Sequence, residues 1–277
     1  MSTQIAKVAL ITGASSGIGR ATALALASAG YVAYATARQP HALAALERAG
    51  LHALPLDVTD ERSMAAAVQR IEAAHGAIDV LVNNAGASEM GPLEEIELAR
   101  VRHLFETNVF GMLRLCQLAL PGMRRRGGGR IVNVSSMGGE FTTPFSGAYH
   151  ASKYAVESLS DALRFEVQPF GVGVIVIQPG VVQTPFGARA QASIRTSEDS
   201  PYAAQLDAFR RFLAANADGD SAEVLTPDLV AQVIVDAVSA AQPETRYKVG
   251  AEAEQLASAR RSMSDRKWDA LYRQLLG

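Results

Sequence analysis

Short apolar runs alternate along the chain with longer segments in which apolar residues recur at helical spacing. The runs occupy residues 8–11, 31–37, 51–58, 80–82, 131–134, 172–177 and, more weakly, 247–249. Several are continuously apolar, as in parallel strands that are covered on both faces. The helical segments between them begin near Gly17, His41, Asp60, Leu98, Ala148 and Pro227. This alternation predicts an α/β fold with a doubly wound parallel sheet and right-handed crossovers.

We expect a single domain, because no repeat, low-complexity linker or change of composition divides residues 1–277. The stretch 185–225 fits the alternation poorly and mixes polar residues with Tyr202, Phe209 and Phe212. Long excursions from a compact domain are usually lids or binding loops, so this stretch is predicted to be a helical substrate lid. Residues 251–277 form a C-terminal helical segment with an amphipathic stripe that includes Trp268 and Tyr272. The stripe is expected to pack on the domain, the lid or a partner subunit, with contact to a membrane surface as the alternative.

Composition and charge exclude several classes of function. The chain is 48% hydrophobic and carries a formal net charge of -2, which gives it no electrostatic footprint for nucleic acid. The run of arginines at 124–126, followed by glycines, is interpreted as the end of a long helix. The single cysteine, Cys116, excludes an internal disulfide, and the five histidines lack metal-ligand spacing, so no metal is predicted. Since neither a signal peptide nor a membrane span is recognisable, we expect a cytoplasmic protein.

A glycine-rich turn follows the first predicted strand and opens a helix. It reads G-x-x-x-G-x-G and contains Gly13, Ser15, Ser16, Gly17, Ile18 and Gly19. Glycines allow the backbone to approach a phosphate closely, and the helix N-terminus favours the negative charge of the phosphate. The two serine hydroxyls can donate hydrogen bonds to phosphate oxygens. The turn therefore predicts a nucleotide site, and an ordinary glycine-rich strand–helix turn is the alternative.

The end of the second predicted strand bears on the identity of the nucleotide. An acidic residue there would bind a ribose 2′-hydroxyl, but the chain reads Thr36-Ala37-Arg38. A guanidinium at Arg38 can pair with a 2′-phosphate through charge-assisted hydrogen bonds. We therefore predict that NADP(H) is preferred and that NAD(H) remains possible, whereas a solvated surface arginine is the alternative.

Tyr149 and Lys153 are four residues apart, so on a helix they lie on one face. An ammonium group in that position stabilises a phenolate and lowers the tyrosine pKa from its free value of about 10. Val156 and Val167 continue the same face, which predicts that the pair turns inward. Such a tyrosine could exchange a proton in carbonyl and alcohol redox chemistry. Without other motifs, a solvated pair would be the simpler interpretation.

Together these motifs resemble the short-chain dehydrogenase/reductase family, closely over residues 5–185, and this resemblance implies a Rossmann-like sheet. The resemblance also rests on Asp57-Val58, Asn83-Asn84-Ala85-Gly86, Asn108, Ser135-Ser136, Pro179-Gly180 and Thr184. The segments around Met137, Pro144, Pro169 and Pro185 are similar to the hydroxysteroid- and retinol-dehydrogenase-like branch.

The resemblance implies a role for each of these residues. Ser136 precedes Tyr149 by 149 − 136 = 13 residues, the usual spacing of the family, and would bind the substrate oxygen. Tyr149 would exchange the proton, while Lys153 would lower its pKa and hold the nicotinamide ribose. Asn108 would hold a water that links Lys153 to solvent. The other implied cofactor contacts are Asp57 and Val58 at the adenine, Asn83, Ala85 and Gly86 near the adenosine and phosphates, and Pro179, Gly180, Val182 and Thr184 at the nicotinamide.

The sequence thus predicts an NADP(H)-dependent oxidoreductase that interconverts a carbonyl and a secondary alcohol. The expected pocket residues Phe141, Phe145 and Phe186, with Tyr202 and Phe212 in the lid, favour an apolar steroid-, retinoid- or lipid-like substrate. Family resemblance also implies a homodimer or homotetramer. One alternative is a regulator that senses NADP(H) without turnover, although such proteins usually lose the tyrosine or the lysine. Another is a nucleotide-sugar epimerase, whose glycine turn is usually spaced differently.

Overall fold

The computed structural model describes residues 6–195, 199–217 and 225–276, with side chains undescribed for 212–217, 252, 275 and 276. Within these residues seven strands form one parallel sheet in the order β3-β2-β1-β4-β5-β6-β7. The strands are β1 (Val8–Ile11), β2 (Val32–Ala37), β3 (His52–Pro55), β4 (Val80–Asn83), β5 (Gly129–Val134), β6 (Val172–Pro179) and β7 (Arg246–Val249). The predicted doubly wound, Rossmann-like sheet in a single domain is confirmed.

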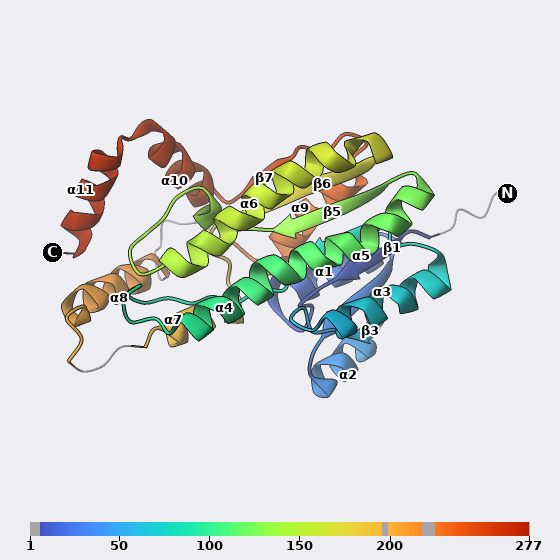
Figure 1. Cartoon of the computed structure of the whole chain (residues 1–277), viewed down its shortest axis with the longest axis horizontal. Helices are drawn as coiled ribbons and strands as arrows, with labels where there is room; N and C mark the ends of the chain where they lie inside the picture. Colours follow the sequence, from blue (N-terminus) through green and yellow to red (C-terminus); the bar gives the residue numbers. More distant parts are fainter. Residues whose placement is uncertain (1–5, 196–198, 218–224, 277) are drawn as a thin grey trace.

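Helices cover both faces of the sheet (Figure 1). They are α1 (Gly17–Ser28), α2 (Pro40–Arg48), α3 (Glu61–His75), α4 (Leu98–Phe105), α5 (Gly111–Arg126), α6 (Gly147–Val167), α7 (Pro185–Ser193), α8 (Ala203–Ala217), α9 (Pro227–Ser239), α10 (Ala251–Ser262) and α11 (Asp265–Leu276). Leu26 of α1, Leu46 of α2 and Ile234 of α9 pack in one core cluster. Ile71 of α3 and Leu115 of α5 belong to a second cluster, so each face of the sheet has its own hydrophobic core.

The order of the strands in the sheet reverses between β1 and β4. Strands β2 and β3 lie on one side of β1, and the later strands lie on the other side. In open α/β sheets, ligands bind outside the carboxyl ends of the strands at such a switch point. The glycine-rich turn follows β1 there, and Asn84 to Gly86 follow β4. The topology therefore brings the predicted nucleotide-binding segments to one edge of the sheet.

Two predicted boundaries differ from the structure. The apolar run 51–58 contains a strand only to Pro55, because Asp57 Oδ1 accepts hydrogen bonds from the Thr59 amide (2.9 Å) and hydroxyl (2.8 Å), which turns the chain. The sixth strand continues to Pro179 and so reaches further than predicted. The arginines of 124–126 do end a long helix, which stops at Gly127 in the left-handed conformation (φ 77°).

The region 185–225 contains helices α7 and α8, and it gathers with α10 and α11 at one end of the molecule (Figure 1). Helix α11 contacts α8. Trp268 of α11 is buried and donates a hydrogen bond from Nε1 to the carbonyl oxygen of Thr142 (3.3 Å). The amphipathic stripe of the C-terminal segment therefore packs on the domain through its tryptophan.

Candidate active site

A cavity of about 470 Å³ opens along the carboxyl ends of the strands. Its walls come from the segments that follow β1, β2, β3, β4, β5 and β6, together with residues of α4, α6 and α7. The predicted site residues that line it are Gly13, Ser15, Ser16, Gly17, Ile18, Arg38, Asp57, Val58, Ala85, Gly86, Ser136, Tyr149, Lys153, Pro179, Gly180, Val182, Thr184 and Phe186. Residues from segments far apart in the sequence thus meet around one space.

The glycine turn is shaped so that its backbone can approach a ligand. Gly13 and Gly17 have positive φ angles of 64° and 55°, which favour glycine. A Cβ at Gly13 would lie 2.8 Å from the Ala85 Cα, and one at Gly17 would lie 3.1 Å from the Thr184 Cγ2. Helix α1 begins at Gly17, and the Ser16 side chain makes no capping hydrogen bond to its first turn. These open N–H groups at the cavity wall fit the phosphates of a dinucleotide.

Positive charge gathers at the end of β2. Arg38 is exposed and lines the cavity, and it has no ion pair among the described residues. Burial by itself would raise the pKa of Asp57, but hydrogen bonds from Thr59 and the charges of Arg38 and His103 hold it below its usual value. Asp57 therefore stays ionised between two basic side chains. The guanidinium group of Arg38, which makes no ion pair among the described residues, could accept a further anion at the cavity wall.

Ser136, Tyr149 and Lys153 meet on the other side of the cavity. Lys153 is 6% exposed, and its Nζ donates a hydrogen bond to the carbonyl oxygen of Val134 (2.9 Å). The same nitrogen lies 5.8 Å from the ring centroid of Tyr149. Ser136 Oγ accepts a hydrogen bond from the Gly138 amide (3.1 Å) and also interacts with the Tyr149 hydroxyl. The hydroxyl, phenol and ammonium groups predicted to act together are therefore neighbours.

The predicted lowering of the Tyr149 pKa is wrong for this structure. Burial raises the pKa of Tyr149 to about 12, and the hydrogen bond with Ser136 offsets only part of that rise. Burial also lowers the pKa of Lys153 to about 8, against the opposing charge of Glu157. Both effects have one cause, since removing either group from water disfavours its charged form. Helical spacing indicated the proximity of the two groups correctly but gave no measure of this desolvation.

Asn108 is not part of the cavity wall. It lies in a π-helical turn, Glu106–Phe110, between α4 and α5. Its Nδ2 donates to the Ala87 carbonyl oxygen and to Ser152 Oγ (2.9 Å each), and its Oδ1 accepts from the Ala87 amide (2.8 Å). The side-chain donors are therefore committed to the segment after β4 and to α6. The hydrogen bonds of the side chain thus tie together two walls of the site, and the contact with a water that serves Lys153 stays a prediction.

Two predicted cofactor contacts also lie behind the cavity. Asn83 pairs in register with Asn133 and donates to its Oδ1 (2.9 Å), so its side chain points into the core, and Asn84 lines the cavity in its place. The reason is the alternation of side chains along a strand. Gly19 is buried, and a Cβ there would lie 2.6 Å from the Gly13 carbonyl oxygen. Its small size lets α1 pack against the turn.

Of the three phenylalanines predicted to contact the substrate, two are also displaced, whereas the predicted substrate contacts Ser136 and Tyr149 line the cavity. Phe141 is 1% exposed and packs edge-on against Trp268, with ring centroids 5.7 Å apart. Phe145 packs against Phe209 of α8 (5.5 Å) and is not in the cavity wall. Only Phe186 lines the cavity, with its ring 5.9 Å from that of Tyr149.

The two lid aromatics named from the sequence do not join the cavity wall either. Tyr202 is hydrogen-bonded to Glu94 at the surface. The side chain of Phe212 lies outside the described residues.

The sequence reasoning missed several residues of the cavity wall. They are Ala37, Leu56, Thr59, Asn84, Ala87, Ser88, His103, Thr107, Val134, Ser135 and Arg189. Asn84 and Ser135 belong to motifs quoted above but were given no contact, and strand alternation could have identified them as cavity residues. His103 and Thr107 are four residues apart on one side of the α4 region, but their sequence context gave no sign that this side faces a ligand. Arg189 carried no recognisable signal.

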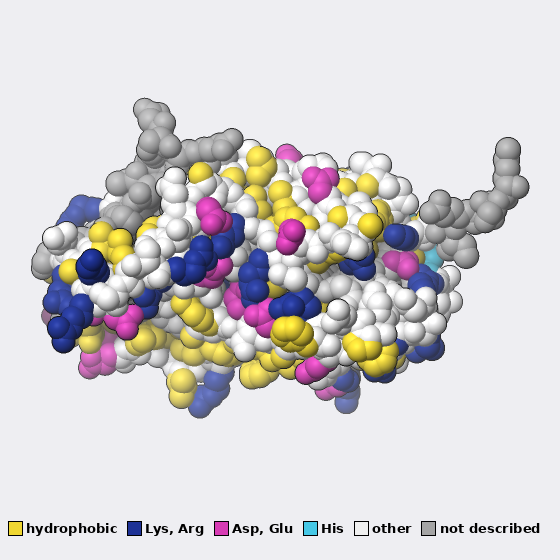
Figure 2. Space-filling model, turned by 90° about the horizontal axis from the view of Figure 1, so that it is seen from above, with side chains coloured by type: hydrophobic (Ala, Val, Ile, Leu, Met, Phe, Trp, Pro, Cys, Tyr) yellow, Lys and Arg dark blue, Asp and Glu magenta, His cyan; other side chains and the backbone are white. Residues whose placement is uncertain are grey.

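Among the described residues, no cluster of three His, Cys, Asp or Glu side chains could hold a metal ion. No helix in the described part of the chain is both long and apolar enough to cross a membrane. On the face shown in Figure 2, basic and acidic side chains are interspersed, so that face has no continuous basic tract.

The chain matches a family model described as short chain dehydrogenase over residues 7–195. It is 38% identical over 245 residues to a 3-ketodihydrosphingosine reductase from Bacteroides thetaiotaomicron, covering 88% of each protein. It is 37% identical over 252 residues to human 17-beta-hydroxysteroid dehydrogenase type 1, covering 87% of this chain and 76% of the human protein.

Solved structures of similar proteins share the fold. A short-chain dehydrogenase from Streptomyces avermitilis is 35% identical and superposes with a TM-score of 0.80, covering 98% of this chain and 99% of the other. A Burkholderia phymatum short chain dehydrogenase/reductase in complex with NAD (92% of each chain) and an actinorhodin polyketide ketoreductase with NADPH (91% of this chain, 99% of the other) are each 30% identical, with TM-scores of 0.76. These neighbours support a nicotinamide cofactor for the chain.

Proposed function

The chain belongs to the short-chain dehydrogenase family of oxidoreductases, and from this premise we propose that it interconverts a ketone and a secondary alcohol with NADP(H). The observation that carries the proposal is the meeting of Ser136, Tyr149 and Lys153 in the same cavity as the glycine turn. A hydroxyl, a phenol and an ammonium group at the end of a dinucleotide-sized site are the groups that carbonyl reduction needs.

When bound, the nicotinamide cofactor supplies or accepts the hydride. On the protein side, the backbone of Gly17 and Ile18 at the start of α1 would hold its phosphates. Val182 and Thr184, which line the cavity beyond β6, would hold the nicotinamide end, and Asp57 and Val58 the adenine.

Ser136 and Tyr149 would act on the substrate oxygen. Ser136 would donate a hydrogen bond to that oxygen as it gains negative charge, an effect typically worth about 10²–10³ in rate. Tyr149 would donate its proton to the same oxygen, and its pKa of about 12 keeps it protonated at neutral pH. The Lys153 ammonium group would stabilise the resulting phenolate.

The preference for NADP(H) rests on Arg38. Its exposed guanidinium group lines the cavity at the end of β2, where an acidic residue would instead bind a ribose 2′-hydroxyl. A charge-assisted hydrogen bond to a 2′-phosphate, worth about 1.5–3 kcal/mol, would give a preference of about 10–100-fold.

The proposed substrate is an apolar ketone. Phe186 stands beside Tyr149, and the relatives named above are, by their names, a reductase of a 3-ketosphingoid base and a dehydrogenase of a hydroxysteroid. A ketone flanked by hydrocarbon would place its oxygen at Tyr149 and its apolar body against Phe186.

The experiment is a screen of steroid ketones, retinal and long-chain 3-keto compounds. Each assay monitors the loss of NADPH absorbance, and parallel assays contain NADH in place of NADPH. We expect turnover of at least one apolar ketone with NADPH. Tyr149→Phe should abolish turnover and leave NADPH affinity near that of the wild type. Tight NADPH binding without turnover of any substrate in the panel would instead favour a nucleotide-sensing regulator, and binding of a UDP-sugar would favour an epimerase.

We further propose a homodimer or homotetramer in a reducing cytoplasm. Assembly is supported by two exposed aromatic side chains on the helices, Phe110 beside α5 (51% exposed) and Phe165 on α6 (65% exposed). A reducing compartment is supported by Cys116, which is buried and forms no disulfide. Light scattering during gel filtration tests the assembly, and a monomer at micromolar concentration would contradict it.

A further inference from the structure

A buried carboxylate lies one helical turn beyond the lysine of the site. Glu157 follows Lys153 by four residues on α6, so the two side chains share one face of the helix. Glu157 is 8% exposed and Lys153 is 6% exposed. Acidic and basic side chains are seldom buried to this degree unless they are paired. Glu157 belongs to none of the motifs from which the site was predicted.

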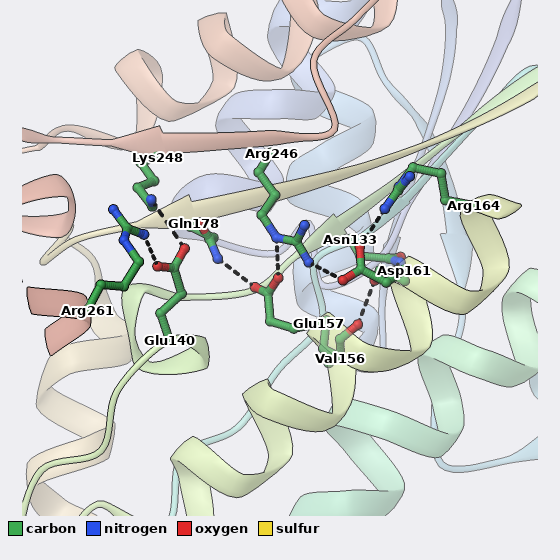
Figure 3. Close-up of polar contacts among 11 residues, drawn as sticks. Asn133, Glu140, Val156, Glu157, Asp161, Arg164, Gln178, Arg246, Lys248 and Arg261 are labelled. Atoms are coloured by element: carbon green, nitrogen blue, oxygen red, sulfur yellow. Dashed lines mark hydrogen bonds and ion pairs between the residues drawn. The ribbon is translucent and has the colours of Figure 1, made fainter. Parts of the chain in front are cut away.

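Both oxygens of the Glu157 carboxylate are held by donors from the sheet (Figure 3). Gln178 of β6, which is fully buried, donates from Nε2 to Oε1 (3.0 Å), and Arg246 of β7 donates from Nε to Oε2 (2.9 Å). A guanidinium group and a second donor favour the ionised form of a carboxyl group. Both oxygens of the Glu157 side chain are therefore held in place, one helical turn from Lys153.

Arg246 is itself fixed by a second carboxylate. It donates from Nη2 to Asp161 Oδ2 (2.7 Å), and Asp161 also accepts from Arg164 (2.9 Å) on the same helix (Figure 3). Strand β7 thus brings a cation to two successive turns of α6. This cation lies beyond residues 7–195, over which the family model matches the chain.

The turn that carries Ser136 packs on the same carboxylate. A Cβ at Gly139 would lie 2.8 Å from Glu157 Cγ and 3.0 Å from its Oε1. The ionisable groups next to Glu157 are Lys153 and Asp161 on its own helix and Arg246 on β7, whereas β6 contributes the uncharged Gln178 and the turn Met137–Gly139 has no ionisable side chain. Glu157 therefore contacts the turn after Ser136 and faces Lys153.

We propose that Glu157, held in place by Arg246 and Gln178, is a positioning residue that keeps Lys153 cationic and aimed at the Val134 carbonyl group. The inference rests on the proposed function for its catalytic consequence. Burial disfavours the charged form of Lys153, and the charge of Glu157 opposes that effect. Without Glu157, the ammonium group would lose its proton at a lower pH and could no longer stabilise the Tyr149 phenolate.

The test measures the titration of Lys153 directly. The four lysines of the chain, Lys7, Lys153, Lys248 and Lys267, give a small set of signals in a protein labelled with ¹³C at lysine Cε, and Lys153→Arg identifies the relevant one. An opposite charge within about 4–6 Å shifts a pKa by about 1–3 units. We therefore expect Glu157→Gln to lower the titration midpoint of Lys153 by about one pH unit, and Glu157→Asp to lower it by about half as much.

Asp161→Asn is the matched control. It removes a carboxylate that shares Arg246 but lies two helical turns from Lys153, so the Lys153 midpoint should stay near that of the wild type. In reduction assays, the alkaline limb of kcat/KM should move to lower pH in Glu157→Gln by the same amount as the midpoint, and stay in place in Asp161→Asn.

An unchanged titration midpoint of Lys153 in any folded Glu157 variant would overturn the inference. If Glu157→Gln does not fold, the midpoint is measured in Glu157→Asp instead. The titration needs neither cofactor nor substrate. If the midpoint moves but the wild type reduces no ketone, the coupling stands and the proposed function fails. If the wild type is active and the midpoint does not move, only this inference fails.

Discussion

Replacing Gly19 by alanine tests whether α1 must pack directly on the glycine turn. A Cβ at this position would overlap Asn84 Nδ2 and lie 2.6 Å from the carbonyl oxygen of Gly13, which is backbone. Asn84 Nδ2 donates to the carbonyl oxygens of Thr12 (2.9 Å) and Gly13 (3.3 Å), so it cannot move without breaking bonds that join β4 to the turn. The helix must therefore shift, or these bonds must break.

The expected cost follows from these contacts. Overpacking in a close-packed region costs about 1–3 kcal/mol, and loss of a buried hydrogen bond adds about 1 kcal/mol. We therefore expect Gly19→Ala to destabilise the protein by about 2–4 kcal/mol. At about 2–4 °C per kcal/mol for a chain of this size, the melting temperature should fall by about 5–15 °C. Because the start of α1 moves with Gly19, NADPH should also bind more weakly.

The assay is thermal unfolding followed by circular dichroism, with and without NADPH. Gly187→Ala in α7 is the matched control, since it is also a helical glycine but has no atom within 4 Å of a built Cβ. It should raise the stability by about 0.5–1 kcal/mol through helix propensity. Equal melting temperatures for the two variants, or a wild-type melting temperature for Gly19→Ala, would show that α1 does not need to pack this closely on the glycine turn.

Three further outcomes are expected. Arg38→Ser should weaken NADPH binding about 10–100-fold and change NADH binding little, as measured by fluorescence titration; equal losses for both cofactors would contradict the role of the guanidinium group. Cys116 is 1% exposed and burial raises its pKa to about 12, so a thiol reagent at pH 8 should label it only as the protein unfolds, whereas rapid labelling of the native protein would show the site to be open. Burial lowers the pKa of His150 to about 4. The unfolded chain therefore protonates this histidine below about pH 6.5, whereas the folded chain protonates it only below about pH 4. Stability should therefore fall across that window by up to about 3 kcal/mol, and His150→Asn should lose less than the wild type in urea unfolding at pH 7 and pH 4.5; an equal loss would exclude the histidine as a cause.

The parts of the site that the sequence predicted well depend on local chemistry. The glycine turn follows β1 because an apolar strand, a φ-permissive turn and a helix occupy one continuous segment around Gly13 and Gly17. Tyr149 and Lys153 lie side by side because residues four apart on a helix share one face. Parallel strands then bring such segments to one edge whatever the distance between them along the chain.

The errors concern the direction in which side chains point once the elements pack. Phe141 and Phe186 are both aromatic residues near the site, yet one packs under Trp268 and the other faces Tyr149. The difference depends on where α11 packs, which no local pattern encodes. Asn83 and Asn84 show a recoverable error, because strand alternation after the buried run Val80–Asn83 already sends neighbouring side chains to opposite faces.

The nicotinamide side of the cavity depends on chain that lies far beyond the motifs. The segment after β6 carries Val182 and Thr184, and its backbone is fixed by hydrogen bonds from the Gly180 amide to the Val249 carbonyl oxygen (3.0 Å) and from the Gln183 amide to the Leu225 carbonyl oxygen (2.9 Å). Both acceptors follow residue 195, where the family match ends. Val249 belongs to β7, and this strand also supplies Arg246, which binds Glu157. Because β7 fixes part of this wall and also supplies the partner of the carboxylate beside Lys153, we expect a displacement of β7 to disturb the predicted cofactor contacts and the proposed proton transfer together, although no residue of β7 itself lines the cavity.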